Sequence, residues 1–295
     1  MKRHWGTALA GVALLVSGSA DGVPVSYQEK GAVLTFTRDN MDFVSDAYPD
    51  ALEGTQLCTV CGILGGENTV WLILPWEIGL QEYDLHGRPG RVVPYPVIRN
   101  IGPFTRFFAR AEGVYVLRDK GGRRPDRLSF QVYSFADSAW SNPVQIPGAS
   151  QFTPARDALG FTVKDGEVWI VDYLKPMGIR ISRGASPLMT IDAAGPTAMD
   201  PMVRRPAALN GTGVRMYSID REWGKYVQYE IVDAGGDVMG TLRWEPRGTR
   251  DERASNRESV RRPGWAILVD ATVLKLDVSV RREPDDKIQI MRWAP

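Results

Sequence analysis

Val168-Trp169-Ile170-Val171 is one copy of a short, valine-led strand pattern that recurs along the chain. Successive copies begin 44, 54, 46 and 59 residues apart. Repeats of that length between strand-rich units are typical of β-propeller blades. The pattern therefore predicts an all-β fold built from repeated sheets. The other copies are Val70-Trp71-Leu72-Ile73-Leu74, Val114-Tyr115-Val116-Leu117, Val214-Arg215-Met216-Tyr217 and Val273-Leu274-Lys275-Leu276.

Each copy extends to a unit of four strands. A stretch rich in small or apolar residues precedes it, as in Leu159-Gly160-Phe161-Thr162, and a tight turn such as Asp165-Gly166 joins the two. A third segment that alternates apolar and polar residues follows, as in Leu128–Tyr133. Four of the five copies also show a fourth segment. We therefore predict a β-propeller of five four-stranded blades, with a sixth left open in residues 21–57 and a β-sandwich as the alternative fold.

Ring closure is predicted from the strand that is left over. The last copy lacks a fourth strand before Pro295, whereas Val33-Leu34-Thr35-Phe36 has no unit of its own. We expect this N-terminal strand to complete the last blade, because closure removes the exposed edges of an open sheet.

Two segments resemble a known propeller class. Glu82-Tyr83-Asp84-Leu85-His86-Gly87-Arg88 and Gly166-Glu167-Val168-Trp169-Ile170-Val171-Asp172 are similar to the strand-turn-strand signature of NHL-type and related six-bladed propellers. The resemblance covers most of residues 56–293. It implies the fold and not one activity, because such families include ligand-binding scaffolds, protein-interaction platforms and calcium-dependent hydrolases.

The N-terminus has the pattern of a secretory signal. Met1-Lys2-Arg3-His4 is basic, Trp5–Val16 is an apolar run of 12 residues, and Ser17-Gly18-Ser19-Ala20 offers small residues at a cleavage site. The run is shorter than the roughly 20 residues that span a bilayer. We expect cleavage after Ala20, a secreted or periplasmic location, no membrane span, and one propeller domain over residues 21–295.

The charge balance argues against nucleic acid as a partner. Lys2 and Arg3 leave with the signal, so 34 basic residues face 35 acidic ones. Duplex-binding proteins usually carry a basic excess that neutralises phosphates. We expect a monomer whose partner is a small molecule or a protein.

Histidine is too scarce for most acid–base catalysis. The chain has two, His4 in the signal and His86 in a turn between outer strands. A Ser-His-Asp or Cys-His arrangement would need His86 as its base, and zinc prefers several His or Cys ligands. We therefore predict no metal site and no cofactor, and interpret His86 as an ordinary turn residue.

Cys58-Thr59-Val60-Cys61 is a CxxC motif without the histidine that covalent haem attachment requires. In an exported chain we expect a disulfide between Cys58 and Cys61. Because three extended residues span about 10 Å, more than a disulfide allows, the bridge requires a turn at this point. A redox or metal role is the alternative.

The remaining candidates follow the valine-led strands, in loops that propellers place around the mouth of the central channel. Converging carboxylates there would hold Ca²⁺ or act as an acid–base pair on a glycoside, and a tryptophan beside a carboxylate suits a sugar. Aspartate at a strand end also caps turns, which is the more economical interpretation. The candidate ligand-binding residues are Trp76, Glu77, Asp119, Asp172, Asp220 and Trp223.

Two functions stay open at this stage. The first is an exported binding or protein-interaction scaffold with an unknown ligand, favoured because no nucleophile or acid–base set is evident. The second is a hydrolase, either calcium-dependent on esters or lactones, or a glycosidase that uses carboxylates at the channel mouth.

Overall fold

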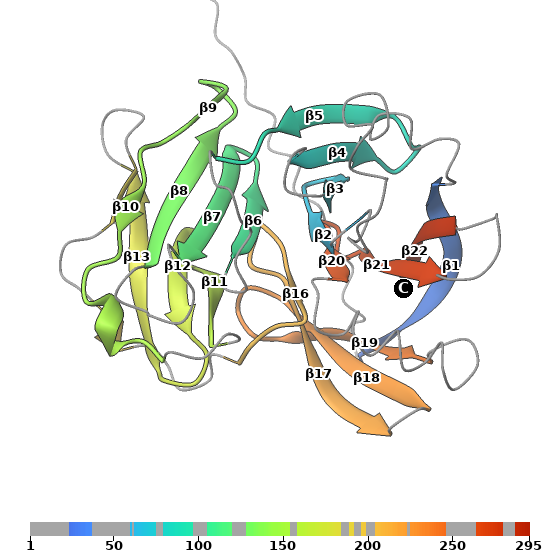
Figure 1. Ribbon diagram of the computed structural model, residues 1–295. Coiled ribbons are helices and arrows are strands. Elements are labelled where there is room, and N and C mark those ends of the chain that lie inside the picture. Colours follow the sequence, from blue (N-terminus) through green and yellow to red (C-terminus); the bar gives the residue numbers. More distant parts are fainter. Residues whose placement is uncertain are drawn as a thin grey trace, which may run out of the picture.

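Strands make up nearly all the regular structure of the computed structural model (Figure 1). A single 3₁₀ turn, η4 (Ala149–Gln151), is the exception among the described residues. Structural statements below concern residues 24–36, 60, 62–74, 79–96, 105–119, 128–153, 158–183, 189–191, 196–198, 204–222, 225–245, 264–279 and 287–295.

The described strands form five antiparallel units, three of four strands and two of five, which we call blades 1 to 5. Blade 1 holds β2 (Gly62–Gly65), β3 (Thr69–Ile73), β4 (Leu80–Asp84) and β5 (Pro89–Val93). Blade 2 holds β6 (Arg106–Arg110), β7 (Gly113–Asp119), β8 (Leu128–Ser134) and β10 (Val144–Gln145), with the short β9 (Ala139–Trp140) also on β8. Blade 3 holds β11 (Leu159–Lys164), β12 (Glu167–Asp172), β13 (Met177–Arg183) and the short β14 (Met189–Ile191) and β15 (Thr197–Ala198).

Blades 4 and 5 share one continuous eight-stranded sheet. Blade 4 holds β16 (Ala208–Leu209), β17 (Arg215–Glu222), β18 (Tyr226–Val232) and β19 (Val238–Trp244). Blade 5 holds β20 (Trp265–Ile267), β21 (Val273–Ser279), β22 (Lys287–Ala294) and β1 (Val25–Phe36). The first strand of each blade is the inner one: β20, β2, β6 and β11 lie side by side in that order, and β16 packs on β20.

This arrangement confirms the predicted β-propeller class and differs from the two facing layers of a sandwich. Within the described residues there are five blades, one fewer than in the six-bladed class that the sequence resembles. Of residues 21–57, where a sixth blade was left open, Val25–Phe36 form β1 and residues 37–57 lie outside the described part of the chain.

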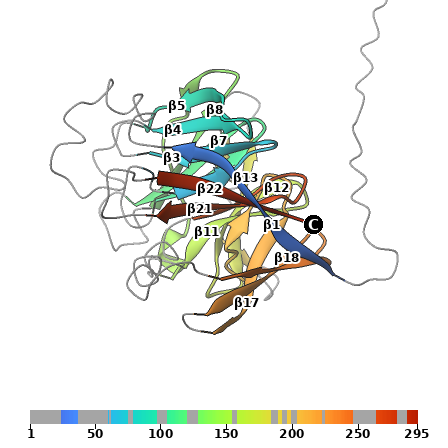
Figure 2. The ribbon, with the colours of Figure 1, turned by 90° about the vertical axis from the view of Figure 1, so that its right-hand side faces the viewer.

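Strand β1 closes the ring as the sequence predicted. Its second half pairs antiparallel with β22, with Leu34 opposite Ile290 and Phe36 opposite Ile288. Its first half pairs in parallel with β19 of blade 4, with Val25 opposite Gly240. Figure 2 shows β1 crossing the outer side of β22 toward blade 4. One strand therefore covers two outer edges, in agreement with the principle that closure protects strand edges.

Two glycines allow β1 to change partners. Gly31 has a φ of 95° and lies where the β1–β22 register shifts, a conformation that side chains rarely adopt. At Gly240, an added Cβ would lie 2.6 Å from the Val25 carbonyl oxygen. Glycine is thus required where the two strands approach most closely.

We call the contact between neighbouring blades a seam, and side-chain alternation determines what fills each one. Successive residues of a strand point to opposite faces, so each blade packs on both neighbours. Four seams contain an apolar cluster: blades 5 and 1, blades 1 and 2, blades 2 and 3, and blades 4 and 5. Between blades 3 and 4, Leu209 packs against the cluster of blades 2 and 3, and the described residues form no cluster of their own.

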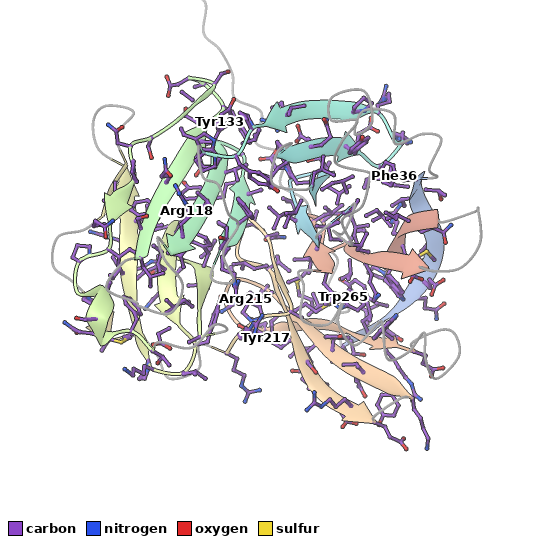
Figure 3. All side chains as sticks on the ribbon, in the orientation of Figure 1. Phe36, Arg118, Tyr133, Arg215, Tyr217 and Trp265 are labelled. Carbon is purple, nitrogen blue, oxygen red and sulfur yellow. The ribbon has the colours of Figure 1, made fainter. Side chains whose placement is uncertain are left out.

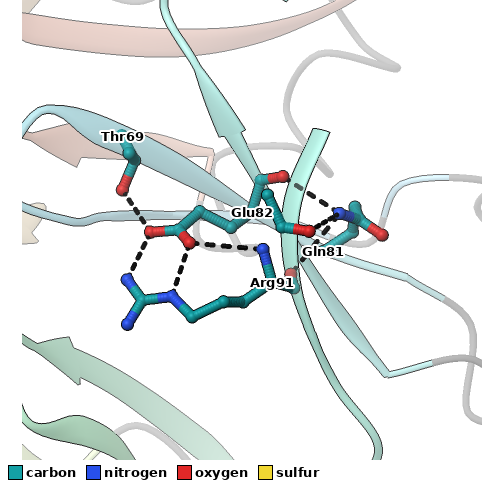
Figure 4. Close-up of polar contacts among 5 residues, drawn as sticks. Thr69, Gln81, Glu82 and Arg91 are labelled. Carbon is teal, nitrogen blue, oxygen red and sulfur yellow. Dashed lines mark hydrogen bonds and ion pairs between the residues drawn. The ribbon is translucent and has the colours of Figure 1, made fainter. Parts of the chain in front are cut away.

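A charged clamp reinforces seam 1–2 (Figure 4). Arg91 Nε lies 2.7 Å from Glu82 Oε2, and its Nη2 lies 2.7 Å from Oε1, so the pair is bidentate. Burial would raise the pKa of Glu82, but hydrogen bonds from Arg91 and Thr69 outweigh burial, and the pKa is lowered. The Arg91 guanidinium also lies 3.8 Å from the ring centroid of Phe135 in blade 2. The clamp therefore holds the outer strands of blade 1 against blade 2.

Seam 4–5 contains a buried lysine instead. Lys275 is 4% exposed, and its Nζ lies 4.4 Å from the ring centroid of Trp244 and 5.7 Å from that of Trp265. Its Nζ donates to the Leu276 carbonyl oxygen at 3.2 Å. Burial lowers the pKa of Lys275 to about 8, with Asp277 acting in the opposite direction. Figure 3 shows Trp265 in the lower right of the ring, between blades 4 and 5.

We expect Leu34→Ala to weaken the ring closure. Leu34 is 4% exposed in seam 5–1, so its truncation should cost about 3 kcal/mol of unfolding free energy, measured by urea denaturation. Val92→Ala is the control, because Val92 is 53% exposed and its loss should change stability by less than about 0.5 kcal/mol. Equal effects of the two variants would contradict the role of β1.

Because the pKa of Lys275 is lowered, we expect the protein to become more stable as the pH rises. Its pKa is lowered in the folded protein, so the unfolded chain binds more protons above pH 8 and stability should increase from pH 7.5 to 9.5. Lys275→Met should remove this rise and add up to about 3 kcal/mol near pH 7. Lys164→Met, at an exposed position, is the control. A rise that persists in Lys275→Met would assign the effect to another group.

Candidate functional site

The candidate site lies at the end of the propeller where the inner strands begin. We call this end the entry face. Strand β6 begins there with Arg106, β11 with Leu159 and β16 with Ala208. Strand β12 ends at the same face, because its last residue, Asp172, lies opposite Leu159. The entry face therefore corresponds to the side where the sequence predicted ligand-binding residues.

Most of the predicted site residues cannot be placed on it. The side chain of Asp119, the last residue of β7, lies outside the described part of the structure. The other residues that lie outside it are Trp76, Glu77, Trp223, Cys58 and Cys61.

Asp172 lies at the entry face, and both of its carboxylate oxygens accept hydrogen bonds from backbone N–H groups. It is 1% exposed, and its Oδ2 accepts from the Thr153 N–H at 2.6 Å. Its Oδ1 accepts from the N–H groups of Leu174 and Lys175, at 2.9 and 3.2 Å. A carboxylate with these partners stabilises the turn after β12 and ties it to the segment after β10.

Asp220 lies away from the inner strands. β16 pairs with Arg215 and Met216 at the start of β17, whereas Asp220 is further along the β17–β18 hairpin that extends from the body of the protein (Figure 1). It is exposed, and its Oδ2 accepts from the Tyr226 hydroxyl at 2.8 Å. Asp172 and Asp220 therefore make contacts only with their own surroundings and not with each other.

Tyr173, next to Asp172, contributes a partly buried hydroxyl to the entry face. Its hydroxyl donates to the Phe161 carbonyl oxygen at 2.7 Å, so the ring lies along the inner strand β11. Gly160 makes room for it, since a Cβ there would lie 2.5 Å from Tyr173 Oη. Burial raises the pKa of Tyr173, while the positive charges of Arg205 and Arg106 act in the opposite direction. The phenol thus stays protonated, close to two guanidinium groups.

Strand alternation shows what else faces seam 3–4. Val168 and Ile170 pack toward blade 2, so the intervening Trp169 faces blade 4. Met216 packs toward blade 5, so its two neighbours face blade 3. Figure 3 shows these two side chains where β17 leaves the centre of the ring. They are Arg215 and Tyr217.

Two buried donors in this seam have no acceptor among the described residues. The Trp169 Nε1 and Arg215 Nε atoms are buried without a hydrogen-bond partner. Arg215 is otherwise held by its Nη2, which donates to the carbonyl oxygens of Asp233 and Ala234 at 3.1 and 3.2 Å. An unsatisfied buried donor costs about 1–3 kcal/mol, so such groups call for a structural or functional reason.

We call this group of residues the seam 3–4 site. Its arginines carry positive charge, its tyrosine and tryptophan side chains provide aromatic rings, and all of them have hydrogen-bond donors. None of these residues has a carboxylate. Across the described residues, no group of three or more His, Cys, Asp or Glu side chains is close enough to hold a metal ion. The seam 3–4 site comprises Trp169, Tyr173, Arg205, Arg215 and Tyr217, with Arg106 of blade 2 near Tyr173 at the entry face.

The sequence analysis did not name the residues of this group. Asp172, which it did name, immediately precedes Tyr173. Arg106 begins β6 of blade 2, Arg205 lies just before blade 4, and Tyr217 is on β17 of blade 4. They form no local motif, so only the packing of blades 2, 3 and 4 brings them near Tyr173. The one available signal was the aromatic residue beside a turn-capping aspartate.

Comparisons with known proteins give fold-level likenesses. No family model matches the sequence, and no curated protein matches it. The chain is similar to the crystal structure of glutaminyl cyclase from Myxococcus xanthus, with a TM-score of 0.40, 10% identity and coverage of 92% of this chain and 98% of that one. It is also similar to a member of the DUF4221 family from Bacteroides vulgatus, with a TM-score of 0.34, 8% identity and coverage of 81% and 78%.

A third similar structure is the calcium-binding protein regucalcin from Agrobacterium tumefaciens, with a TM-score of 0.30, 12% identity and coverage of 79% of this chain and 90% of that one. At such identities and TM-scores these likenesses assign no activity to this chain. The class of protein is a β-propeller, defined by its own strand pairing.

Gly160→Ala should test the packing of Tyr173. The added methyl group would lie 2.5 Å from Tyr173 Oη, so we expect a loss of about 1–3 kcal/mol in unfolding free energy. In a Tyr173→Ala background the same change should cost much less, because the clash is gone. The measurement is a double-mutant cycle by urea denaturation. Additive costs would show that Tyr173 does not occupy this position.

Proposed function

We propose that this chain is a ligand-binding β-propeller that holds a small, acceptor-rich, anionic molecule in the seam 3–4 site. The observation that carries the proposal is the pair of buried donors, Trp169 Nε1 and Arg215 Nε, which have no acceptor. A ligand oxygen would satisfy them and recover the cost of leaving them unpaired. Preorganised donors of this kind are characteristic of binding sites.

The charges at the entry face support an anionic ligand. Arg106 and Arg205 both lie close enough to Tyr173 to affect its pKa. Guanidinium groups match the geometry of carboxylate and phosphate groups. The rings of Tyr173 and Tyr217 add flat apolar surface, which suits a ligand with both a polar and an apolar part.

The location of the binding event is also a proposal. We infer export to the periplasm or the medium, because residues 1–20 have the pattern of a secretory signal. None of the described helices is long and apolar enough to cross a membrane. The proposal is of a single propeller domain over residues 21–295 that acts as a monomer on a small molecule or a protein segment.

The hydrolase alternative depends on carboxylates. Of the four acidic candidates, Asp172 has both oxygens engaged by backbone N–H groups, and Asp220 bonds Tyr226 on the exposed hairpin. Glu77 and the Asp119 side chain lie outside the described residues. Metal analysis of the purified protein tests this alternative: bound Ca²⁺, with ester hydrolysis that a chelator abolishes, would replace the binding proposal.

The binding proposal predicts a specific effect of Trp169→Phe. A panel of uronic acids, dicarboxylates, sugar phosphates and acidic dipeptides is screened for thermal stabilisation of the wild-type protein. For a compound that stabilises it, we expect Trp169→Phe to raise Kd about tenfold, because the ring stays and the N–H donor is lost. Stability without the ligand should change little, since the lost donor is unpaired.

Arg205→Gln should weaken the binding of the same compound, because the positive charge of the guanidinium is lost. Arg243→Gln is the matched control, because Arg243 lies on the exposed outer strand β19 and bonds Glu245. If none of the panel binds, or if Arg205→Gln, Trp169→Phe and Arg243→Gln bind alike, the seam 3–4 site is not the ligand site.

A further inference from the structure

A second polar cluster lies in seam 1–2, on the opposite face of blade 2. Arg118 on β7 and Ser129 on β8 are directly opposite each other across the strand pair. Gln131 is two residues along β8, so its side chain shares their face. Val114 and Tyr133, at alternate positions on the same face, pack in the cluster that joins blades 1 and 2. Arg118, Ser129 and Gln131 therefore face blade 1.

The positive charge of this cluster has no counter-charge among the described residues. The Arg118 Nη1 atom donates to the amide oxygen of Gln131, a neutral acceptor. Burial lowers the pKa of Arg118, the expected direction for a cation that leaves water without a carboxylate beside it. Arg91 in the same seam has the opposite arrangement, because Glu82 binds it through two hydrogen bonds. Figure 3 shows Arg118 on blade 2.

Ser129 provides an independent sign of a missing partner. Its side chain is 0% exposed, and its Oγ atom has no hydrogen-bond partner. Opposite residues of an antiparallel pair have Cβ atoms about 5 Å apart, so the hydroxyl and the guanidinium of Arg118 belong to the same small region. Among the described residues, neither group has an anionic acceptor.

Gln131 is held in the orientation that Arg118 needs. Its Nε2 donates to the Ser141 carbonyl oxygen at 2.8 Å, which directs its amide oxygen toward Arg118. The guanidinium is therefore positioned before any ligand arrives, and preorganisation lowers the entropy cost of binding.

We propose that Arg118 and Ser129 form a binding site for a small oxyanion, a carboxylate or phosphate group, with Gln131 as the positioning residue. The anion would accept from the remaining guanidinium N–H groups and from the Ser129 hydroxyl, and so neutralise the partly buried charge of Arg118. This site is separate from the seam 3–4 site, because Arg118 faces blade 1 whereas Arg106 and Phe108 point to the other side of blade 2, toward blade 3.

Inorganic phosphate and acetate are the probes, titrated calorimetrically into the full-length protein, with chloride used to hold the ionic strength constant. We expect saturable binding of at least one of them. Tight phosphate with weak acetate would identify a phosphate site, and the reverse would identify a carboxylate site. Absence of saturable binding of both would overturn the proposal.

Three variants place the binding at this cluster. Arg118→Gln should raise the Kd of the bound probe at least tenfold, and Ser129→Ala at least threefold while the protein remains folded. Arg88→Gln should have no effect, because the Arg88 side chain is 77% exposed and pairs with Asp84. Equal affinity in Ser129→Ala and wild type would remove Ser129 from the site, and equal affinity in Arg118→Gln would overturn the proposal.

Ser129→Asp gives a test that does not depend on affinity. It places a carboxylate opposite Arg118, so a site built for an oxyanion should accept it: the variant should unfold at or above the wild-type temperature and should no longer bind the probe. A closed, fully packed position would instead make Ser129→Asp strongly destabilising, which contradicts the proposal. Trp169→Phe should bind the probe like wild type, so failure of the seam 3–4 proposal would be seen separately.

Discussion

The pairing of β1 with both β22 and β19 is the contact on which the rest of the structure depends. An open series of blades would leave the outer edge of the last sheet unpaired, and its inner face would lose half of its packing. One strand from the N-terminus completes the last blade and extends to the blade before it. Closure then fixes the position of each blade relative to its neighbours, and this position determines which side chains meet in each seam.

The seams differ in what they bury, and this difference separates stability from function. Four are filled by apolar clusters. Of the charged groups inside them, Arg91 pairs with Glu82, Lys275 lies beside two tryptophan rings, and Arg118 bonds the neutral amide of Gln131. In the seam between blades 3 and 4, the buried Trp169 Nε1 and Arg215 Nε donors have no acceptor among the described residues, and Ser129 Oγ in seam 1–2 likewise has no partner there. Such unsatisfied donors lower the stability of the protein, and a ligand with acceptor atoms could satisfy them.

The candidate site shows why sequence patterns found the face and missed the residues. A turn-capping aspartate recurs because each blade needs one kind of turn, so Asp172 was visible in the repeat and proved to bind backbone N–H groups. Arg106, Arg205 and Tyr217, in contrast, do not belong to the pattern that repeats along the chain. Their proximity to Tyr173 arises from the ring, which brings together residues more than a hundred positions apart.

The sequence by itself determined the repeating unit, the turns and the closing strand, because strand alternation and glycine-containing turns act over a few residues. It also determined the leftover strand near Leu34, whose partner could be inferred by counting. Only the tertiary structure decided which faces meet, and hence that the partly buried Arg118 lies opposite Ser129 with no carboxylate partner among the described residues. Charge pairing across seams depends on distances between separate blades, and no local pattern of residues encodes those distances.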